Sequence, residues 1–175
     1  MLARVRVLYR HMRILLIWIY KSLVMSSTSQ KKNIIVGFTC GAFDVFHAGH
    51  MLMLKEARTN CDYLIVGLQS DPTIDRPQKN KPVQSIEERK IQLEGCSYVD
   101  EIMLYNTEAD LENIFKNVSI NVRIIGADYI DKSFTAKDYC LQNSIKIVYN
   151  TRGHSYSSTE LRDRVYKAEK AKREK

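Results

Sequence analysis

Short apolar runs alternate with longer amphipathic segments along most of this chain. Five runs rich in β-branched and aromatic residues have the length of strands, at residues 34–38, 63–68, 101–104, 122–125 and 145–149. The segments between them are long enough for helices that lead from one strand to the next. The pattern therefore predicts the α/β class, with a parallel five-stranded sheet and helices on both faces.

Three of the predicted helices have a recognisable start, a hydroxyl residue followed three positions later by an acid. The pairs are Ser85 with Glu88, Thr107 with Asp110, and Ser157 with Glu160. In the last of these helices the apolar residues Leu161, Val165 and Ala168 fall on one side. We expect this stripe to pack against the sheet.

Residues 41–50 are the most informative stretch, because they join the first predicted strand to a predicted helix. They read Gly-Ala-Phe-Asp-Val-Phe-His-Ala-Gly-His. A helix start binds anions, since its first N–H groups are unpaired and carry the positive end of the helix dipole. His47 and His50 add two imidazoles that donate hydrogen bonds, and Gly49 lets the backbone approach a ligand. The sequence has no further cluster of metal ligands nearby, so the stretch predicts a phosphate site rather than a metal site.

These residues resemble the GTFDxxHxGH signature of the cytidylyltransferases and related nucleotidyltransferases. Four further motifs resemble that family in the family's own order. They are Lys81 ahead of a helix that carries Arg89, the sequence YVDEI at 98–102, the turn GAD at 126–128, and Arg152 followed by Ser157 and Ser158. The similarity spans about residues 33–166, which makes it far more specific than any single motif.

The resemblance implies a single Rossmann-like domain that transfers CMP from CTP to a phosphorylated small alcohol. Glycerol 3-phosphate is the expected acceptor, and CDP-glycerol and pyrophosphate are the expected products. The implied catalytic residues are His47, His50, Lys81 and Arg89. The implied nucleotide-binding residues are Gly41, Ala42, Phe43, Asp128, Arg152, Ser157 and Ser158.

Both the attacking phosphate and the leaving pyrophosphate are already ionised at neutral pH, so this chemistry needs charge neutralisation and in-line positioning. We expect the two histidines to hold oxygens of the α- and β-phosphates, and Lys81 to bring a mobile cation to the charge that develops. Arg89 would orient either its helix or the phosphates. Asp128 would lie near the base or the ribose. Mg²⁺ is expected to enter with the triphosphate, without a metal site made of protein ligands.

Two positions depart from the family pattern. Ala42 replaces a threonine that is common in the family, and Ser97 stands before Tyr98 where cytidylyltransferases usually carry Arg or Lys. An adenylyltransferase acting on a sugar phosphate, such as a heptose 1-phosphate, therefore remains the main alternative. Choline-phosphate or ethanolamine-phosphate cytidylyltransferase is the third. His154 and Tyr156 have no assigned role and could contact the base or the acceptor.

Readings outside this group of enzymes have less support. The basic chain could be a nucleotide- or nucleic-acid-binding module, but its aromatic residues are not interleaved with its basic ones. The two histidines also resemble the HIGH element of class I aminoacyl-tRNA synthetases, although no KMSKS stretch is present. We therefore expect CTP and a phosphorylated acceptor as ligands, no specific nucleic acid, and a homodimer.

Composition fits one globular domain, with 175 residues of which 45% are hydrophobic. The formal net charge of +7 is concentrated at the two ends. Residues 1–32 form a basic extension and a polar linker, residues 33–166 the nucleotidyltransferase domain, and residues 167–175 a basic tail. We expect the extension to be dispensable. Its apolar patch at 14–20 is too short to span a bilayer, so it is a targeting segment, a surface-lying helix or a stretch ahead of the true start at Met25.

The four cysteines are scattered along the chain without a Cys-x-x-Cys pair. They are Cys40, Cys61, Cys96 and Cys140. This spacing is typical of reduced, buried thiols rather than of a zinc site or a disulfide framework, and it predicts a cytoplasmic protein.

Overall fold

The computed structural model describes residues 33–151 and 153–174. Residues Ile34–Lys175 form one compact unit. The predictions made for residues 1–32 and for Arg152 lie outside the described residues.

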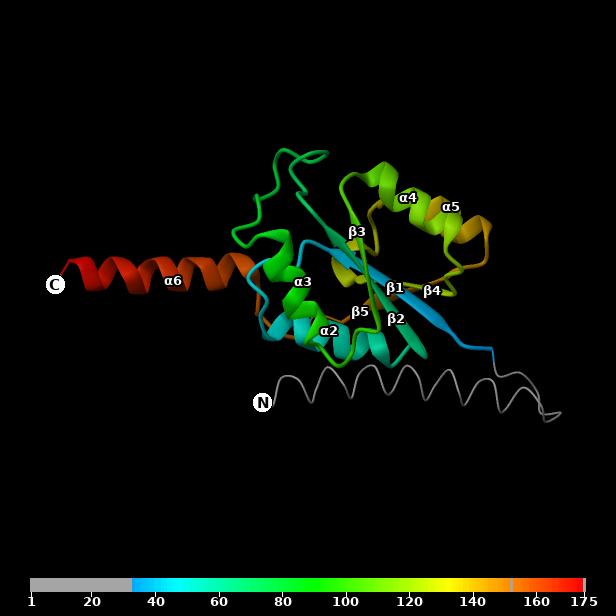
Figure 1. Ribbon diagram of the computed structural model, residues 1–175, viewed down its shortest axis with the longest axis horizontal. Coiled ribbons are helices and arrows are strands. Elements are labelled where there is room, and N and C mark those ends of the chain that lie inside the picture. The colour runs from blue at the N-terminus through cyan, green and yellow to red at the C-terminus, as the bar shows by residue number, and fades with distance from the viewer. Residues whose placement is uncertain (1–32, 152, 175) are drawn as a thin grey trace. The chain divides into compact units, whose positions relative to one another are not determined.

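Five parallel strands form one sheet, as the hydrophobic pattern predicts (Figure 1). The strands are β1 (Val36–Gly41), β2 (Tyr63–Gln69), β3 (Glu101–Tyr105), β4 (Val122–Gly126) and β5 (Lys146–Asn150). Their order in the sheet is β3-β2-β1-β4-β5, and every neighbouring pair is parallel.

The limits of β1 differ from the predicted 34–38. Ile34 and Ile35 are 46% and 44% exposed and precede the strand. At its other end β1 continues three residues further, and Gly41 pairs with Leu68 of β2. The prediction ended the strand too early because Thr39 and Cys40 are less apolar than the residues before them, although Thr39 is buried in the sheet.

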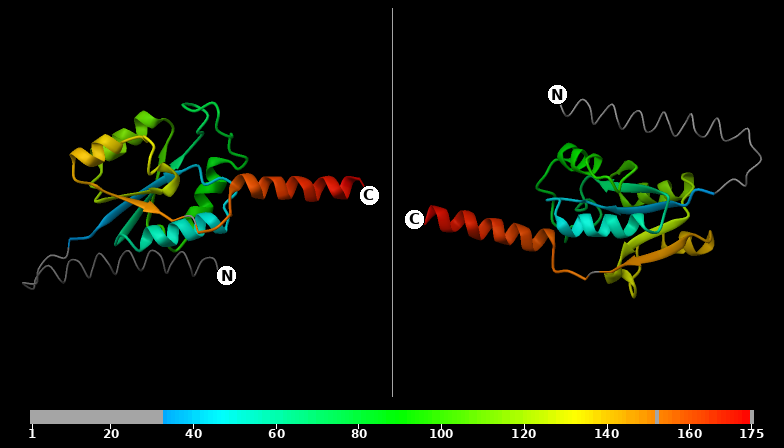
Figure 2. Two further views of the ribbon diagram at one scale, coloured as in Figure 1. Left: turned by 180° about the vertical axis from the view of Figure 1, so that it is seen from behind. Right: turned by 90° about the horizontal axis from the view of Figure 1, so that it is seen from below.

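Helices cover both faces of the sheet, which confirms the predicted layers (Figure 1, Figure 2). The helices are α2 (Ala48–Arg58), α3 (Ile86–Glu94), α4 (Glu108–Asn117), α5 (Lys137–Gln142) and α6 (Ser158–Arg173), with a 3₁₀ turn, η1 (Ala127–Tyr129). Leu54 of α2 and Leu93 of α3 pack on one side of the sheet. Phe115 of α4 and Cys140 of α5 pack on the other. The sheet therefore separates two apolar cores.

The predicted helix starts agree with the structure. Ser85 and Thr107 each accept a hydrogen bond from the backbone N–H three residues on, and the acid at that position bonds back to the N-cap backbone. Ser157 accepts a hydrogen bond from the backbone N–H of Glu160 at the start of α6. Three helices thus begin at the positions that the sequence marks.

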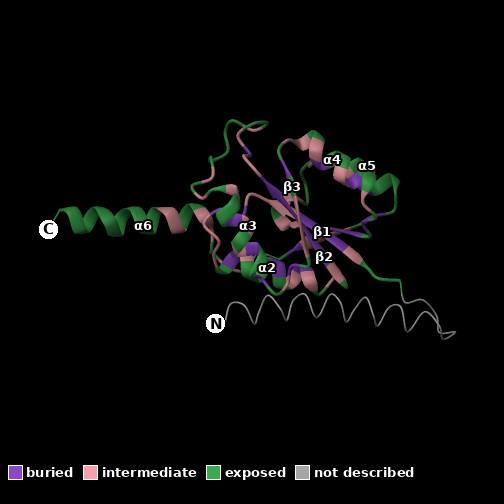
Figure 3. Cartoon of the chain, viewed as in Figure 1, coloured by how far each residue is buried: buried purple, intermediate pink, exposed green. Residues whose placement is uncertain are grey.

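The expected packing of α6 on the sheet is wrong. No described residue of α6 is buried, and Val165 is 54% exposed. Figure 3 shows α6 extending away from the sheet, with exposed residues along most of its length. The N-terminal end of α6 is held in place, because Ser158 and Arg162 bond to the loop that follows β1. The apolar stripe is therefore not buried against the sheet.

The described residues add two constraints on the chemistry. All four cysteines are free, with Cys96 and Cys140 buried and Cys40 and Cys61 half-buried. None of the described helices is both long enough and apolar enough to cross a membrane.

The strand order reverses at the carboxyl end of β1. The chain passes from β1 through β2 to β3 on one side, and then returns to place β4 and β5 on the other side of β1. In open α/β sheets ligands bind where the strand order reverses in this way, outside the carboxyl ends of the strands. Residues 42–47 follow β1 at this point, so the sheet topology predicts that a ligand binds beside them.

Candidate active site

The starts of α2 and α6 meet through a hydrogen-bonded chain of three residues. His47 is the N-cap of α2, and its Nδ1 accepts the backbone N–H of Gly49 at 3.0 Å. The proton of the neutral ring therefore sits on Nε2, which lies 3.2 Å from Ser158 Oγ. Ser158 in turn donates to the backbone carbonyl of Asp44 at 3.1 Å. The imidazole of His47 is thus fixed in one tautomer, with its N–H aimed at the start of α6.

This arrangement concentrates positive potential. Two helix N-termini, each with unpaired N–H groups, face the same small volume beside His47 and Ser158. The first turn of α2 contains no acid. A phosphate oxygen placed there can accept hydrogen bonds from the helix ends, and from the imidazole or the hydroxyl when it replaces their present acceptor.

His50 lies against His47 in an aromatic setting. The two imidazole rings stack with centroids 4.0 Å apart. Phe46 stacks on His50 at 5.4 Å, and the ring of Phe43 lies at 5.3 Å. Phe43 and Val45 both have φ of 49°, in the left-handed region that side chains rarely adopt. This unfavourable backbone curls the loop so that its aromatic side chains support the histidine pair.

Asp44 joins three segments of the chain at the site. Its Oδ1 accepts backbone N–H groups from Val83 and Gln84 at 3.0 and 2.9 Å, and its Oδ2 pairs with Arg162 of α6. Burial alone would raise the pKa of this carboxyl, which is 5% exposed, but the two backbone bonds and the guanidinium outweigh it and lower the pKa. Asp44 therefore anchors the loop and also holds the Lys81 loop and α6 to it.

Gly49 is required by protein packing as well as by any ligand. A Cβ at this position would lie 2.8 Å from the Tyr156 carbonyl oxygen, 2.8 Å from His47 Cε1 and 3.0 Å from His154 Cε1. Only glycine lets the segment before α6 lie directly on the first turn of α2.

Arg89 lies under the site rather than at its surface. It is 2% exposed, and its guanidinium donates to five backbone carbonyls. These include Ala42 in the loop after β1 and Gln69 and Ser70 at the end of β2. Of the two roles expected for Arg89, this geometry favours orientation of the protein, because the side chain clamps two strand ends together.

Lys81 is exposed on the loop that precedes α3. Its side chain is 80% exposed, and Nζ lies 3.9 Å from Asp71 Oδ2. The loop that carries it is tied to the loop after β1 two residues later, by the bond from Val83 N–H to Asp44. An exposed lysine on an anchored loop is suited to reach a phosphate that arrives from solvent.

The other expected nucleotide contacts are less closely grouped. Gly41 ends β1, and a Cβ there would meet only the ring of Phe43 at ordinary contact distance. Asp128 is exposed in η1. Its Oδ1 would lie 2.6 Å from a Cβ on Gly126, so the carboxylate occupies its present position against residue 126 because that residue is glycine. Gly41 is the last residue of β1 and Asp128 follows β4, and these two neighbouring strands end at the same edge of the sheet.

Arg162 is the residue that the sequence analysis missed. It stands four residues after Ser158 in α6, which puts both on one side of the helix. This spacing, together with the acid Asp44 in the loop after β1, is the signal that could have identified the pair.

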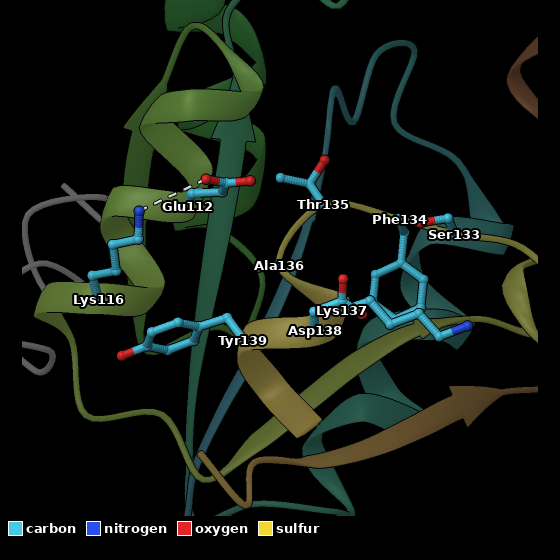
Figure 4. Close-up of a pocket in the computed structure, with 9 residues that line it drawn as sticks. All are labelled: Glu112, Lys116, Ser133, Phe134, Thr135, Ala136, Lys137, Asp138 and Tyr139. Carbon is cyan, nitrogen blue, oxygen red and sulfur yellow. Dashed lines mark ion pairs between the residues drawn. The ribbon is translucent and has the colours of Figure 1, made fainter. Parts of the chain in front are cut away.

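A cavity of about 440 Å³ lies elsewhere, between α4 and residues 133–139 (Figure 4). Phe134 and Tyr139 line it, together with Glu112 and Lys116, which form an ion pair across one helical turn. It belongs to the α4 and α5 side of the sheet, and none of the described candidate residues lines it.

The described residues bring together no group of three or more His, Cys, Asp or Glu side chains that could hold a metal ion. What they bring together is a set of donors for phosphate at the end of β1. A family model described as cytidylyltransferase-like matches residues 38–164, which contain this set. The chain belongs to the cytidylyltransferase-like family.

Two relatives illustrate the range of this family. The chain is 39% identical over 140 residues to a probable ethanolamine-phosphate cytidylyltransferase of Encephalitozoon cuniculi, covering 80% of this chain and 40% of that protein. It is 34% identical over 131 residues to the bifunctional protein HldE of Caulobacter vibrioides, covering 74% of this chain and 27% of that protein. The cytidylyltransferase-like chain thus spans less than half the length of these relatives.

Solved structures share the fold. A lipopolysaccharide core biosynthesis protein from Thermoplasma volcanium matches with a TM-score of 0.59 and 25% identity, over 70% of this chain and all of that one. A bifunctional NMN adenylyltransferase/ADP ribose pyrophosphatase from Francisella tularensis matches with a TM-score of 0.52 and 20% identity, over 77% of this chain and 42% of that one. The second likeness concerns the fold alone.

Proposed function

We propose that this chain transfers CMP from CTP to a phosphorylated small alcohol and releases pyrophosphate. An oxygen of the acceptor phosphate attacks the α-phosphorus of CTP, and the bond from that phosphorus to the oxygen bridging to the β-phosphate breaks. The observation that carries the proposal is the junction of the two helix starts, where His47 Nε2 and Ser158 Oγ lie 3.2 Å apart inside the region of family similarity.

The residues divide the work by position. His47 and His50 hold oxygens of the α- and β-phosphates and follow them into the transition state, where negative charge grows. Ser157 and Ser158, with Arg152, bind the β- and γ-phosphates at the start of α6. Lys81 moves onto the triphosphate from its exposed loop. Arg89 and Asp44 keep these segments in register without touching the substrate.

Mg²⁺ enters with CTP in this proposal. The described residues offer no ready-made set of carboxylates for the ion, and Mg²⁺ is commonly bound through substrate phosphates and water. It neutralises charge on the triphosphate when bound. The hydrogen-bond donors at the helix starts then bind the phosphate oxygens that the ion does not coordinate.

The identity of the acceptor rests on two different supports. The residue pattern favours glycerol 3-phosphate. The relative from Encephalitozoon cuniculi, named for ethanolamine phosphate, favours that alcohol ester instead. We place ethanolamine phosphate first, because 39% identity over 140 residues is the more extensive support. Adenylyl transfer to a sugar phosphate is the second candidate, since Ala42 and Ser97 depart from the cytidylyltransferase pattern.

The test is a competition for product formation by the full chain. The protein is incubated with Mg²⁺, equimolar CTP and ATP, and one acceptor at a time: ethanolamine phosphate, glycerol 3-phosphate or a heptose 1-phosphate. Products are identified by mass, and released pyrophosphate is measured. We expect a predominant CDP-alcohol. A predominant adenylyl product with the sugar phosphate would transfer the assignment to the second candidate, and no pyrophosphate with any pair would contradict the proposal.

A further inference from the structure

A third histidine lies beside the pair that the family signature contains. His154 belongs to the segment between β5 and α6, and its Cε1 is 3.0 Å from the point where a Cβ on Gly49 would lie. The Cε1 atom of His47 is 2.8 Å from the same point. The two imidazoles therefore flank Gly49 from different segments of the chain, over the first turn of α2.

The ring of His154 is held by packing, and one of its nitrogens has no hydrogen bond to the protein. It stacks on Tyr156 with centroids 5.2 Å apart and planes at 27°. Its Nδ1 is buried and has no partner among the described residues. An orphaned buried N–H is rarer than an orphaned acceptor, so the neutral ring carries its proton on Nε2. A rigidly packed imidazole thus has its N–H on the edge away from the buried nitrogen.

The charges around this ring favour an anion as the partner of that N–H. The first turn of α2 has no acid, and the buried carboxylate of Asp44 is already paired with Arg162. Glu56 faces away from the helix start, since it accepts hydrogen bonds from the backbone and the hydroxyl of Thr151. Glu160 is exposed in the first turn of α6. His47, which flanks Gly49 together with His154, is itself a donor.

We propose that His154 binds the pyrophosphate end of the nucleoside triphosphate, donating a hydrogen bond next to His47 and Ser158. This inference rests on the proposed function. The position of His154 determines which phosphates it reaches. It packs on the first turn of α2 and precedes the N-cap of α6 by three residues, so it lies beside the two helix starts proposed to bind the triphosphate. The same phosphates leave as pyrophosphate, so His154 binds the product as well as the substrate.

Two variants separate hydrogen bonding from packing. His154→Phe keeps a flat ring that can stack on Tyr156 but has no donor. His154→Gln restores an N–H donor without the ring. Loss of one hydrogen bond to a charged phosphate corresponds to about a tenfold weaker dissociation constant. We expect His154→Phe to weaken binding of CTP and of inorganic pyrophosphate by that factor with an unchanged Tm, and His154→Gln to recover part of the loss.

The measurement is calorimetric titration of the full chain and both variants with CTP and, separately, with inorganic pyrophosphate, together with KM for each substrate. The inference predicts a raised KM for CTP and little change in KM for the acceptor phosphate. A folded His154→Phe protein that binds pyrophosphate as tightly as the wild type would overturn it and leave the proposed function intact. A wild-type chain that binds neither CTP nor pyrophosphate would overturn the proposed function itself.

Discussion

His47 and Ser158 are 111 residues apart in the sequence, yet His47 Nε2 and Ser158 Oγ lie 3.2 Å from each other. Each stands at the start of a helix, one as the N-cap of α2 and the other as the first residue of α6. The bond joins the two helix starts that we propose to bind phosphate into one structure. Either half alone would be an ordinary helix start.

Removal of the Ser158 hydroxyl should damage the site more than the fold. Ser158→Ala leaves His47 Nε2 and the Asp44 carbonyl without their shared partner, and we expect kcat/KM to fall about tenfold or more. Thr107→Ala is the matched control, because it removes the N-cap of α4, outside the site, and should lower the free energy of unfolding by about 1 kcal/mol. Steady-state kinetics and thermal unfolding of both variants separate the two effects. Equal kinetic losses would contradict the distinct role given to Ser158.

Gly49→Ala should destabilise the protein, although alanine normally favours a helix over glycine by about 0.5–1 kcal/mol. The added methyl group would lie 2.8 Å from the Tyr156 carbonyl oxygen, so the segment before α6 must shift. Gly95→Ala at the end of α3 is the control, because a Cβ there meets only ordinary contacts from 3.5 Å. We expect a lower Tm for Gly49→Ala and an unchanged or higher Tm for Gly95→Ala. The opposite order would contradict the close packing on α2.

Asp44 should contribute to acid sensitivity. Its pKa is lower in the folded chain than in the unfolded one, so the folded state takes up a proton less readily. The stabilisation is therefore complete above the ordinary carboxylate pKa of about 3.9 and is lost as the pH falls through the lowered value. Asp44→Asn removes the partner of Arg162 and should lower the free energy of unfolding by about 1–3 kcal/mol near neutral pH. It should also make that free energy fall less steeply as the pH is lowered.

The control for Asp44 is Asp163→Asn, which removes an exposed ion pair with Lys167 on α6. Such pairs contribute about 0–1 kcal/mol, so the unfolding profile should match that of the wild type. If Asp44→Asn unfolded with the same pH dependence as Asp163→Asn, the coupling of the three segments through Asp44 would be wrong.

Deletion of residues 1–24, so that the chain starts at Met25, should leave Tm and turnover nearly unchanged. The reason is that both apolar cores and the described site residues lie within Ile34–Lys175, which forms a compact unit. Calorimetry and the pyrophosphate assay on the shortened chain test this. An inactive or insoluble product would mean that the extension belongs to the fold.

Local pattern predicted most of the fold, and long-range contacts account for what it missed. Alternating apolar runs and capping boxes at Ser85 and Thr107 depend on residues close in sequence, and they were read correctly. The predicted packing of α6 on the sheet was wrong. The position of this helix depends on an ion pair between Arg162 and Asp44, which lie 118 residues apart in the sequence. A periodic stripe indicates which side of a helix is apolar, but not whether a surface lies opposite it.

In the candidate site, too, local motifs were predictable from the sequence and long-range contacts were not. The family motifs pointed to His47, His50 and Ser158, and the structure brings His47 into contact with each of the other two. Arg89 was expected among the catalytic groups, but its partners are carbonyls at the ends of β1 and β2 that no sequence spacing reveals. The burial of a charged side chain is decided by the tertiary structure around it.

The central claim is that the histidines at the start of α2 stabilise nucleotidyl transfer. Pyrophosphate release from CTP and ethanolamine phosphate is therefore measured for the wild type and for His50→Ala, with thermal unfolding to verify that the variant is folded. The account predicts turnover by the wild type and a loss of about 10²–10³ in rate for His50→Ala, the usual effect of removing one donor to transition-state charge. An unchanged rate in a folded His50→Ala protein would contradict it.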